Sequence, residues 1–527
     1  MKRIVVVGAG TSGWMVASAI KKNCPGVDVT IVYDSKIPTV GVGETLTFFM
    51  PHFMKNVLGL SDEQWMPQVK ATYKTGVSMP GWTAKDSEYQ SGFCLDFPAE
   101  FLASNKFNNL AQEKNCADMD QIDHYTKGGI VDLWCSTYQN GLLGDVTGDD
   151  LIASTGEGYY FSRDRKSIRD LNGTWLVNPT VGYSYHYNAD LVGQSIAELV
   201  GKPSGVSVID STVVSVETDG DNISLLTLKD GSTITADTFV DCSGFHRLLV
   251  KKIPFTWEPC DEYYNDSAIV GPLHYDNTDN PAHCISSNST LAGMDNGWRF
   301  SIPLTNRSGN GYVFNSRLGH NVDQLADELS SVIGFTPPNG FRHIKWDPGH
   351  YKEMMVGNCI AFGLASGFTD PFDANNLSLT TRIVKELVDL LKANPASSNL
   401  DIANLLNFRA KFYYRDIDMR VKSCLRLSPR RDTEYYRLMA DVAEKTYLKE
   451  QFIEHIVNTR KRDFNNQQKF LWKSWTHVAL AVRYGIKLPD VDLSLAPLAK
   501  QYFNFNKTRC LTIANRAPTL NEYYHLN

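Results

Sequence analysis

The sequence lacks the features that direct a protein to a membrane, to nucleic acid or to the secretory pathway. No stretch approaches the ~20 apolar residues that a spanning helix needs. The formal charge of −6 is spread over 527 residues without a long block of one sign, so there is no electrostatic footprint for nucleic acid. A first strand is expected at Lys2 or Arg3, which leaves no room for a leader peptide. We therefore expect a cytoplasmic protein that acts on a small molecule.

Cysteine motifs are also missing, because the 10 cysteines are scattered and form no CxxC pair and no Cys/His cluster at metal-ligand spacing. We expect buried reduced thiols and no metal site. Repeats, low-complexity tracts and Pro/Ser-rich linkers are missing, so nothing marks a clean domain boundary. Because 527 residues with 43% hydrophobic content exceed a typical single domain, we expect two interleaved modules.

The chain opens with the pattern of a strand, a glycine turn and a helix. The apolar run Ile4 to Val7 ends in Gly8-Ala9-Gly10-Thr11-Ser12-Gly13, and a helical pattern follows from Trp14. In this context GxGxxG indicates a dinucleotide site. The first glycine permits a tight turn, the second lets the backbone approach a pyrophosphate, and the third lets helix and strand pack closely. A second strand, residues 27–33, ends beside Asp34, the candidate partner of a ribose hydroxyl.

An antiparallel meander is predicted in the middle of the chain. Val213 to Val216, Leu225 to Leu228 and Ile234 to Val240 are typical of short strands, and Asp230-Gly231 is a hairpin turn signal. The run Asp241-Cys242-Ser243-Gly244 then resembles the second glycine-bearing strand end of two-motif FAD proteins. Together with the first glycine turn, this pattern favours FAD over NAD.

Beyond Thr380 the pattern becomes helical, so we expect the C-terminal third to be mostly α. One face of the first of these helices collects Ile383, Val384, Leu387, Leu390 and Leu391. The charged run at residues 430–436 is interpreted as a solvated, ion-paired helix face.

Four further stretches discriminate among flavoproteins. They are Val40-Gly41-Val42-Gly43-Glu44, residues 71–77 around Lys74, Gly297-Trp298-Arg299-Phe300-Ser301-Ile302-Pro303, and residues 357–373, which end in Asp370-Pro371-Phe372-Asp373. In order and spacing they resemble segments of the flavin-dependent halogenases of the tryptophan-halogenase type. The resemblance implies an α/β fold, with a glutathione-reductase-like Rossmann module that binds FAD and carries inserted antiparallel strands, and a mainly helical substrate module. We expect the FAD-binding module at residues 1–75 and 175–380, and the substrate module at residues 76–174 and 381–527.

The resemblance also implies a reaction and its residues. FADH2 and O2 form a C4a-hydroperoxide, a halide ion converts it into hypohalous acid, and Lys74 directs electrophilic halogenation of an aromatic ring. Trp298, Phe300 and Pro303, here called the flavin wall, would separate the flavin from the substrate, with Phe300 where the family has tryptophan. Cofactor contacts are expected from Gly8, Gly10, Thr11, Ser12, Gly13, Trp14, Asp34, Ile37, Val40, Val42, Gly43, Glu44, Thr45, Val213 and Leu364.

The chain departs from the family at its catalytic carboxylate and at its halide segment. Asp373 stands where the family has a glutamate, and Ala374 replaces the neighbouring serine. Asp373 is the candidate general base or anionic stabiliser, on a side chain one methylene shorter. Asn375 and Asn376 replace the threonine and glycine of the halide site. Because Asn adopts the backbone angles of glycine less freely, we expect a reshaped site that prefers bromide or iodide to chloride.

The expected substrate is an indole or another electron-rich aromatic, in a pocket not committed to free tryptophan. FADH2 is expected from a separate NAD(P)H-dependent flavin reductase, because no second nucleotide domain is apparent. Whether the protein is a homo-oligomer is left open. Two alternatives also stay open, an FAD-dependent aromatic hydroxylase (a monooxygenase) and a flavin-binding protein without catalysis.

Overall fold

The computed structural model describes residues 2–37, 44–45, 49–87, 90–92, 129–153, 156–177, 183–275, 285–462, 474–489 and 493–524. The chain forms two compact units, each built from discontinuous segments. The first unit is Met1–Thr72, Ser184–Asp279 and Phe300–Arg415, and the second is Tyr73–Tyr183, Asn280–Arg299 and Asp416–Asn527. Residues 381–415 therefore belong to the first unit. These units are defined by contacts within the chain and not by what each part binds. The predicted bounds of the FAD-binding and substrate modules therefore stay a prediction.

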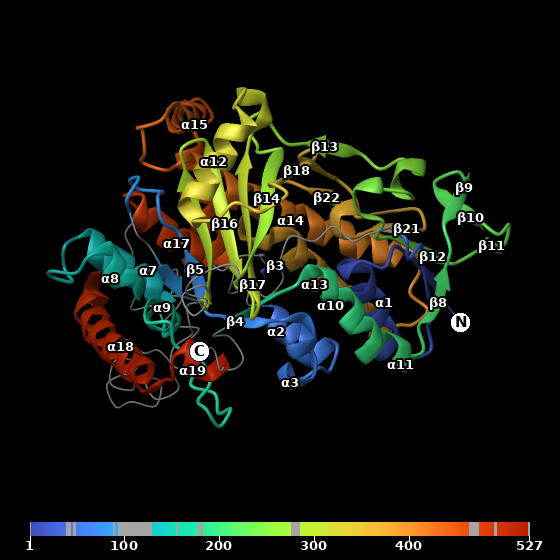
Figure 1. Cartoon of the computed structure of the whole chain (residues 1–527), viewed down its shortest axis with the longest axis horizontal. Coiled ribbons are helices and arrows are strands. Elements are labelled where there is room, and N and C mark those ends of the chain that lie inside the picture. Colours follow the sequence, from blue (N-terminus) through green and yellow to red (C-terminus); the bar gives the residue numbers. More distant parts are fainter. Residues whose placement is uncertain are drawn as a thin grey trace. The chain divides into compact units, whose positions relative to one another are not determined.

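The first unit contains a mainly parallel sheet with the strand order β20-β21-β12-β1-β2-β8. Only β20 runs antiparallel to its neighbour. Strands β1 and β12 are almost wholly buried, as parallel strands covered on both faces must be. Helices α1, α10 and α13 lie together beside the sheet (Figure 1). The predicted α/β fold with a parallel sheet is confirmed. The bounds are β1 Arg3–Val7, β2 Asp28–Tyr33, β8 Ser207–Asp210, β12 Thr238–Asp241, β20 Met355–Val356, β21 Cys359–Ala361, α1 Thr11–Asn23, α10 Ala189–Ile196 and α13 Asn375–Ala393.

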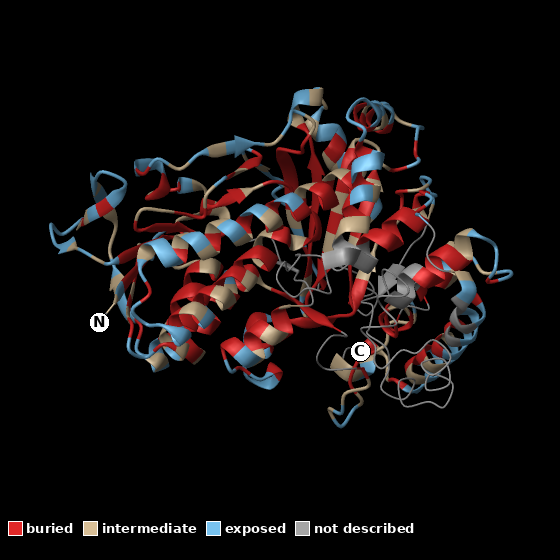
Figure 2. Ribbon diagram, turned by 180° about the vertical axis from the view of Figure 1, so that it is seen from behind, coloured by how far each residue is buried: buried red, intermediate tan, exposed pale blue. Residues whose placement is uncertain are grey.

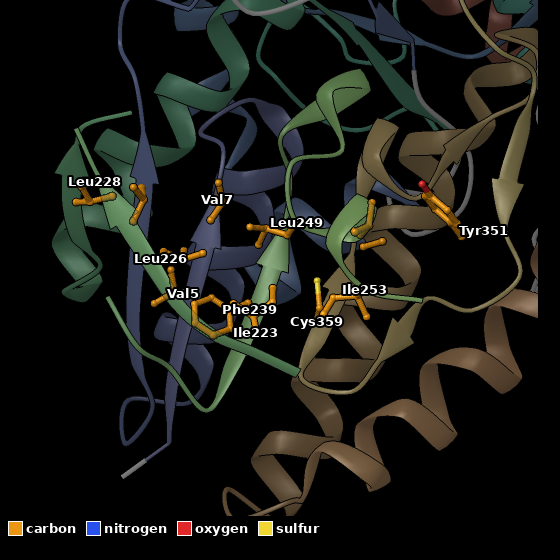
Figure 3. Packing of buried hydrophobic residues seen from close by; sticks show 13 residues of the cluster. Val5, Val7, Ile223, Leu226, Leu228, Phe239, Leu249, Ile253, Tyr351 and Cys359 are labelled. Carbon is orange, nitrogen blue, oxygen red and sulfur yellow. The ribbon is translucent and has the colours of Figure 1, made fainter. Parts of the chain in front are cut away.

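One hydrophobic cluster joins the parallel sheet to the meander of the first unit (Figure 3). Val5, Val7 and Phe239 come from the sheet, whereas Leu226 and Leu228 come from the meander strand β10 (Asn222–Leu228). All five side chains are at most 4% exposed. Burial of this apolar surface holds the meander over the sheet, near the strand that carries the glycine turn.

The meander consists of β9 Val213–Asp219, β10 Asn222–Leu228 and β11 Thr233–Ile234. Its hairpin turn is confirmed, because Gly231 has φ +85° and β10 pairs antiparallel with β11. Figure 2 shows that most of β9 is exposed. The prediction of a single strand from Ile234 to Val240 is wrong. Ile234 pairs with Leu226 in the meander, whereas Thr238 pairs with Ile4 in the parallel sheet, so the chain must break between them to change partners.

Further antiparallel strands and short helices complete the first unit. Val322–Ile333 forms a regular helix, α12, capped by the side chain of Asn321. The other elements are β3 Glu44–Thr45, β7 Ser184–Tyr187, β13 Trp257–Pro259, β14 Ser267–His274, β17 Arg307–Phe314, β18 Arg342–Lys345, β19 Gly349–Tyr351, β22 Gly367–Phe368, α2 Met50–His52, α3 Asp62–Trp65, α11 Lys202–Ser204 and the helical turns Phe53–Val57, Pro67–Val69, Ala197–Gly201, Gly244–His246, Val250–Lys252, Ser316–Leu318, Gly363–Ala365 and Phe372–Ala374.

The second unit is mainly helical. It also holds β15, which pairs with β5, and β5 pairs in turn with β6. Strand β4 (Thr72–Lys74) and strand β16 (Gly297–Pro303) carry the chain between the units, as does the long helix α14 (Asn399–Arg426). No strand follows β22 in the described part of the chain, which agrees with the predicted helical C-terminal third. The bounds are β5 Gly76–Ser78, β6 Gln90–Gly92, β15 Asn288–Met294, α7 Gly129–Gln139, α8 Gly148–Ala153, α9 Gly158–Arg163, α15 Glu434–Lys445, α16 Leu448–Arg462, α17 Ser474–Arg483, the turn Leu493–Leu495, α18 Ala496–Arg516 and α19 Leu520–Tyr524.

Arg430 corrects the prediction of a solvated helix face at residues 430–436. Its side chain is almost wholly buried in the second unit, and its guanidinium donates to the carbonyl of Gly81 at 2.7 Å and to the carboxylate of Asp432 at 2.7 Å. It also lies 4.0 Å from the centre of the Tyr436 ring. These acceptors replace water, so the arginine is an interior anchor of the fold.

The sequence predicted neither membrane-spanning helices nor disulfide bonds. Among the helices that the structure describes, none is both long and apolar enough to cross a bilayer. The described cysteines are all free, and most are buried, which confirms the expected reduced thiols at Cys24, Cys135, Cys242, Cys260, Cys359, Cys424 and Cys510.

Candidate active site

The glycine turn between β1 and α1 leaves no room for side chains at two of its positions. Gly8 has φ +106°, and a Cβ there would stand 2.3 Å from the carbonyl oxygen of Cys242. A Cβ on Gly13 would stand 1.9 Å from the carbonyl oxygen of Gly8. Gly10, the N-cap residue of α1, has no side chain with which to cap the helix. The first backbone N–H groups of α1 are therefore presented to an anionic group such as a pyrophosphate.

Asp34 lies directly after β2, where an acid of a dinucleotide site is expected. The hydroxyl of Thr212 donates to its carboxylate at 2.6 Å, and the N–H of Lys36 donates at 2.9 Å. These hydrogen bonds hold the pKa of Asp34 below its usual value, so the carboxylate is ionised and able to accept from a ribose hydroxyl. Two other predicted cofactor contacts lie near Asp34. Val213, the first residue of β9, directly follows Thr212 and is half-buried, whereas the side chain of Ile37 is exposed.

The carboxyl ends of the parallel strands share one edge of the sheet, and Asp241 organises the loop at the end of β12. Its buried carboxylate accepts from the backbone N–H groups of Ser243, Leu249 and Val250 at 2.7–3.0 Å. The segment Asp241 to Gly244 was predicted, but this role of the carboxylate was not. The available signal was an acidic residue at the end of an apolar strand, which indicates a loop that needs an anionic acceptor.

Gly363 is where two predicted segments meet. It has φ +62°, and a Cβ there would stand 2.4 Å from the hydroxyl oxygen of Ser12 in the glycine turn. The side-chain amide of Asn376 donates to the carbonyls of Gly363 and Gly367, at 3.4 and 2.7 Å. The candidate halide segment and the candidate FAD segment are therefore joined within the first unit, with the predicted contact Leu364 next to their junction.

Asp373 and Ala374 adopt a strained backbone just before α13. Their φ values are +58° and +53°, and residues other than glycine cost about 1–3 kcal/mol each in such regions. The side chain of Asp373 is buried. The amide of Asn375 donates to the carbonyl of Phe372 at 2.6 Å, so this side chain braces the turn. Because the N-cap Ala374 has no capping oxygen, backbone N–H groups at the start of α13 are presented to an anion.

Lys74 ends β4 in the second unit, and its side chain is only 3% exposed. The N–H of the preceding Tyr73 donates to the hydroxyl of Tyr524 at 3.0 Å. The N–H of the following Thr75 donates to the carbonyl of Ser287 at 2.7 Å. The backbone on both sides of Lys74 is therefore fixed. An ammonium is costly to bury, so such a lysine is a strong candidate for a functional group.

The flavin wall lies along β16. Trp298, in the second unit, is fully buried, and Phe300, in the first unit, is 6% exposed. A Cβ on Gly311 of β17 would stand 2.4 Å from Cζ of Phe300, so the missing side chain makes room for the ring. The carbonyl of Pro303 accepts from the hydroxyl of Thr72 at 2.8 Å. Sequence reasoning did not find Gly311 or Thr72, whose roles depend on neighbours distant in the chain.

The comparisons with known proteins decide the family. The sequence profile of the tryptophan halogenase family matches residues 3–491. The chain belongs to this family. It is 28% identical to tryptophan 7-halogenase RebH of Lentzea aerocolonigenes over 443 residues, which is 82% of this chain and 78% of that protein. Two solved structures share the fold. The tryptophan 6-halogenase SttH of Streptomyces toxytricini has a TM-score of 0.81 at 23% identity and 99% coverage of both chains. BrvH, a flavin-dependent halogenase of Brevundimonas sp. BAL3, has a TM-score of 0.77 at 21% identity, with 100% of this chain and 99% of that chain covered.

The tryptophan halogenase family consists of flavin-dependent oxidoreductases, and the first unit of this member fits FAD. The uncapped start of α1 suits the pyrophosphate, and the ionised Asp34 suits a ribose.

The remaining predicted cofactor contacts lie in several places. Thr11 is buried, and the ring of Trp14 packs on Gly201 in the core, where a Cβ on Gly201 would stand 2.8 Å from that ring. Glu44 and Thr45 form β3, which pairs with β7. Val40, Val42 and Gly43 lie outside the described residues. The cofactor role of each residue stays a prediction.

Proposed function

We propose that this member of the tryptophan halogenase family halogenates an indole or another electron-rich aromatic ring, with FADH2 delivered by a separate NAD(P)H-dependent flavin reductase. Bound reduced FAD supplies hypohalous acid from dioxygen and a halide ion. The burial of Lys74 between two anchored neighbours is the observation that carries the proposal beyond family membership. RebH is named for tryptophan, which is consistent with an indole ring as the reacting group.

Lys74 activates the hypohalous acid. Its ammonium donates a hydrogen bond to the acid, or its amine carries the halogen as a haloamine, and either way the halogen becomes available to an aromatic carbon. The ring carbon bonds to the halogen and loses a proton, and the oxygen leaves as water. A buried ammonium suits this step because its hydrogen bonds are stronger where water is excluded.

The flavin wall keeps the substrate away from the cofactor. Trp298 and Phe300 present aromatic bulk along β16, and the bulk of Phe300 depends on the space left by Gly311. Phe300 lacks the N–H donor of the family's tryptophan. We propose that the wall favours halogenation over hydroxylation, which is the activity of the alternative class of enzyme.

The halide lies at the start of α13. The amides of Asn375 and Asn376 already donate to backbone carbonyls, so backbone N–H groups remain as donors for the ion. Asn376 adds bulk where the family has glycine. We propose that this site accepts bromide or iodide more readily than chloride.

The product mass tests the proposed function and the halide preference in one assay. The FAD-loaded protein is supplied with a flavin reductase, NADH, oxygen and equal concentrations of chloride, bromide and iodide, with free tryptophan and other indoles as substrates. We expect products in which bromine or iodine replaces hydrogen, and we expect indoles other than free tryptophan to be among the substrates that react. Gain of oxygen would instead identify a hydroxylase, dominant chlorination would refute the halide preference, and reaction of free tryptophan alone would refute the open pocket.

Asp373→Asn should lower the turnover number by about 100-fold if Asp373 accepts the ring proton or stabilises the cationic intermediate. Asparagine is nearly isosteric and tolerates the left-handed conformation that Asp373 adopts, so the backbone should not change. The measurement is kcat with saturating indole and halide, together with FAD affinity, which should stay constant.

The matched control is Asp347→Asn, because Asp347 is exposed and distant in sequence from every candidate site residue. It should leave both quantities unchanged. Full activity of the Asp373→Asn variant would show that the carboxylate takes no part in catalysis.

A further inference from the structure

Three polar side chains meet in the interior of the second unit. Asp416 comes from α14, His455 from α16 and His477 from α17. They are 0%, 5% and 0% exposed, in that order. Buried polar groups are costly unless their partners compensate them, so the convergence of one carboxylate and two imidazoles from separate helices needs a physical reason.

The geometry brings one oxygen and two nitrogens together. Nε2 of His455 lies 2.9 Å from Oδ1 of Asp416, and Nε2 of His477 lies 3.3 Å from the same oxygen. One ligand atom from each residue lies within 4.8 Å of the other two. Two ligand atoms that each lie ~2.0–2.1 Å from the same zinc ion, with a ligand–zinc–ligand angle of ~90–110°, are ~2.9–3.5 Å from one another. Both oxygen–nitrogen distances fall in this range, so the atoms that hydrogen-bond in the metal-free protein also stand at the separation of neighbouring ligands on one metal ion.

The protonation states also suit metal binding. Burial raises the pKa of Asp416, but hydrogen bonds and charge interactions with both histidines together outweigh it and lower the pKa to about 2. Burial lowers the pKa of His477 to about 4, so its imidazole is neutral near pH 7. An anionic carboxylate and a neutral imidazole are the forms that coordinate metals. The pKa of His477 is also lowered by the nearby positive charge of Arg420, which partly offsets the charge of Asp416.

The rings around the cluster exclude water and hold the imidazoles at a fixed angle. The ring of Phe452 stands edge-on to His477 at 5.8 Å, and the two imidazoles are nearly perpendicular at 5.0 Å. Nδ1 of His477 is buried without a hydrogen-bond partner. In the metal-free protein Nε2 of neutral His477 therefore carries the proton that it donates to Asp416. Binding of a metal ion at Nε2 would move this proton to Nδ1, which has no other partner that opposes the change.

We propose that Asp416, His455 and His477 bind one divalent transition-metal ion, which ties α14, α16 and α17 together. Two imidazoles and one carboxylate favour zinc and its neighbours over magnesium or calcium, which prefer ligand sets made only of oxygen. The site is distinct from the halogenation chemistry, since none of its residues belongs to the proposed flavin, halide or lysine positions.

Zinc and cobalt are the probes. The full-length FAD-loaded protein is stripped with EDTA, incubated with Zn²⁺ or Co²⁺, and passed through a desalting column before its metal content is measured. We expect about one metal ion per chain, visible absorption bands from bound Co²⁺, and a Tm several degrees higher with Zn²⁺ than after EDTA, because an ion that binds only the folded state stabilises it.

Asp416→Asn and His477→Gln should lose the bound ion and the rise in Tm, whereas His274→Gln, at an exposed histidine, should keep both. Circular dichroism and FAD content show whether each variant is folded. If a variant does not fold, the wild-type metal content and the Co²⁺ spectrum still decide. Wild-type protein that retains no metal and shows no cobalt bands would overturn the proposal and identify a purely hydrogen-bonded cluster.

Discussion

Lys74→Ala is expected to reduce halogenation at least about 100-fold, which is the lower end of the effect of removing a positioned proton donor. The reason is that the proposed reaction needs the ammonium to hold or activate hypohalous acid. FAD binding should persist, because the glycine turn and Asp34 lie in the first unit whereas Lys74 lies in the second. The measurement is the rate of halogenated product, together with the hypohalous acid released into solution, which a small thiol or dye reports.

The released acid makes this prediction specific. If Lys74 acts on hypohalous acid, the variant should still release the acid while product formation stops. Loss of both signals would place Lys74 upstream, in formation of the acid, and undiminished product formation would refute the assigned role. A flavin-binding protein without catalysis would show neither signal in the wild type.

Lys85→Ala is the matched control. Lys85 lies in the same unit, and its 65% exposed side chain pairs with Asp295 at 2.9 Å. Exposed ion pairs contribute about 0–1 kcal/mol, so this variant should keep full activity and stability. Lys74→Arg is informative as well, because it keeps the positive charge but cannot form a haloamine.

Gly13→Ala should cost FAD affinity and stability together. The new Cβ would stand 1.9 Å from the carbonyl oxygen of Gly8, so α1 must move away from β1. Overpacking of this kind lowers the free energy of unfolding by about 1–3 kcal/mol. The start of α1 then no longer faces the pyrophosphate as before, and each ~1.4 kcal/mol of lost binding lowers FAD affinity ~10-fold.

The control for this change is Gly26→Ala. Nothing lies within 4 Å of a Cβ at Gly26, and its φ is not in the left-handed region. This variant should therefore bind FAD normally and be as stable as the wild type, or slightly more so. FAD titration and urea unfolding measure both quantities. Equal behaviour of the two variants would contradict the tight packing of the glycine turn.

The N-terminal part of the site was readable from the sequence because its geometry is local. A β-branched run, three glycines and a helical pattern occupy a short stretch, and the observed β1, turn and α1 follow it closely. Asp34 was readable for the same reason, since it directly follows a strand. The hairpin at Gly231 was also local, because the turn requires a positive φ there.

The split of the strand predicted from Ile234 to Val240 was not readable. Composition reports how well a residue suits a strand but not which strand it pairs with, and here the partner changes from β10 to β1. Arg430 illustrates the same limit. Its charge predicted an exposed side chain. The carbonyl of Gly81, more than three hundred residues away in sequence, instead accepts a hydrogen bond from the buried guanidinium and so compensates the loss of water.

Local sequence patterns were thus sufficient to predict the α/β class and the glycine turn, and the resemblance of several motifs to known segments was sufficient to predict the family of this chain. The folded chain was needed to show that Ser12 and Asn376 meet at Gly363, that Lys74 is buried, and that one aspartate and two histidines converge in the second unit. The physical reason is that periodicity and turn chemistry act over a few residues. Contacts between distant segments depend instead on how whole helices and strands pack, which no spacing in the sequence records.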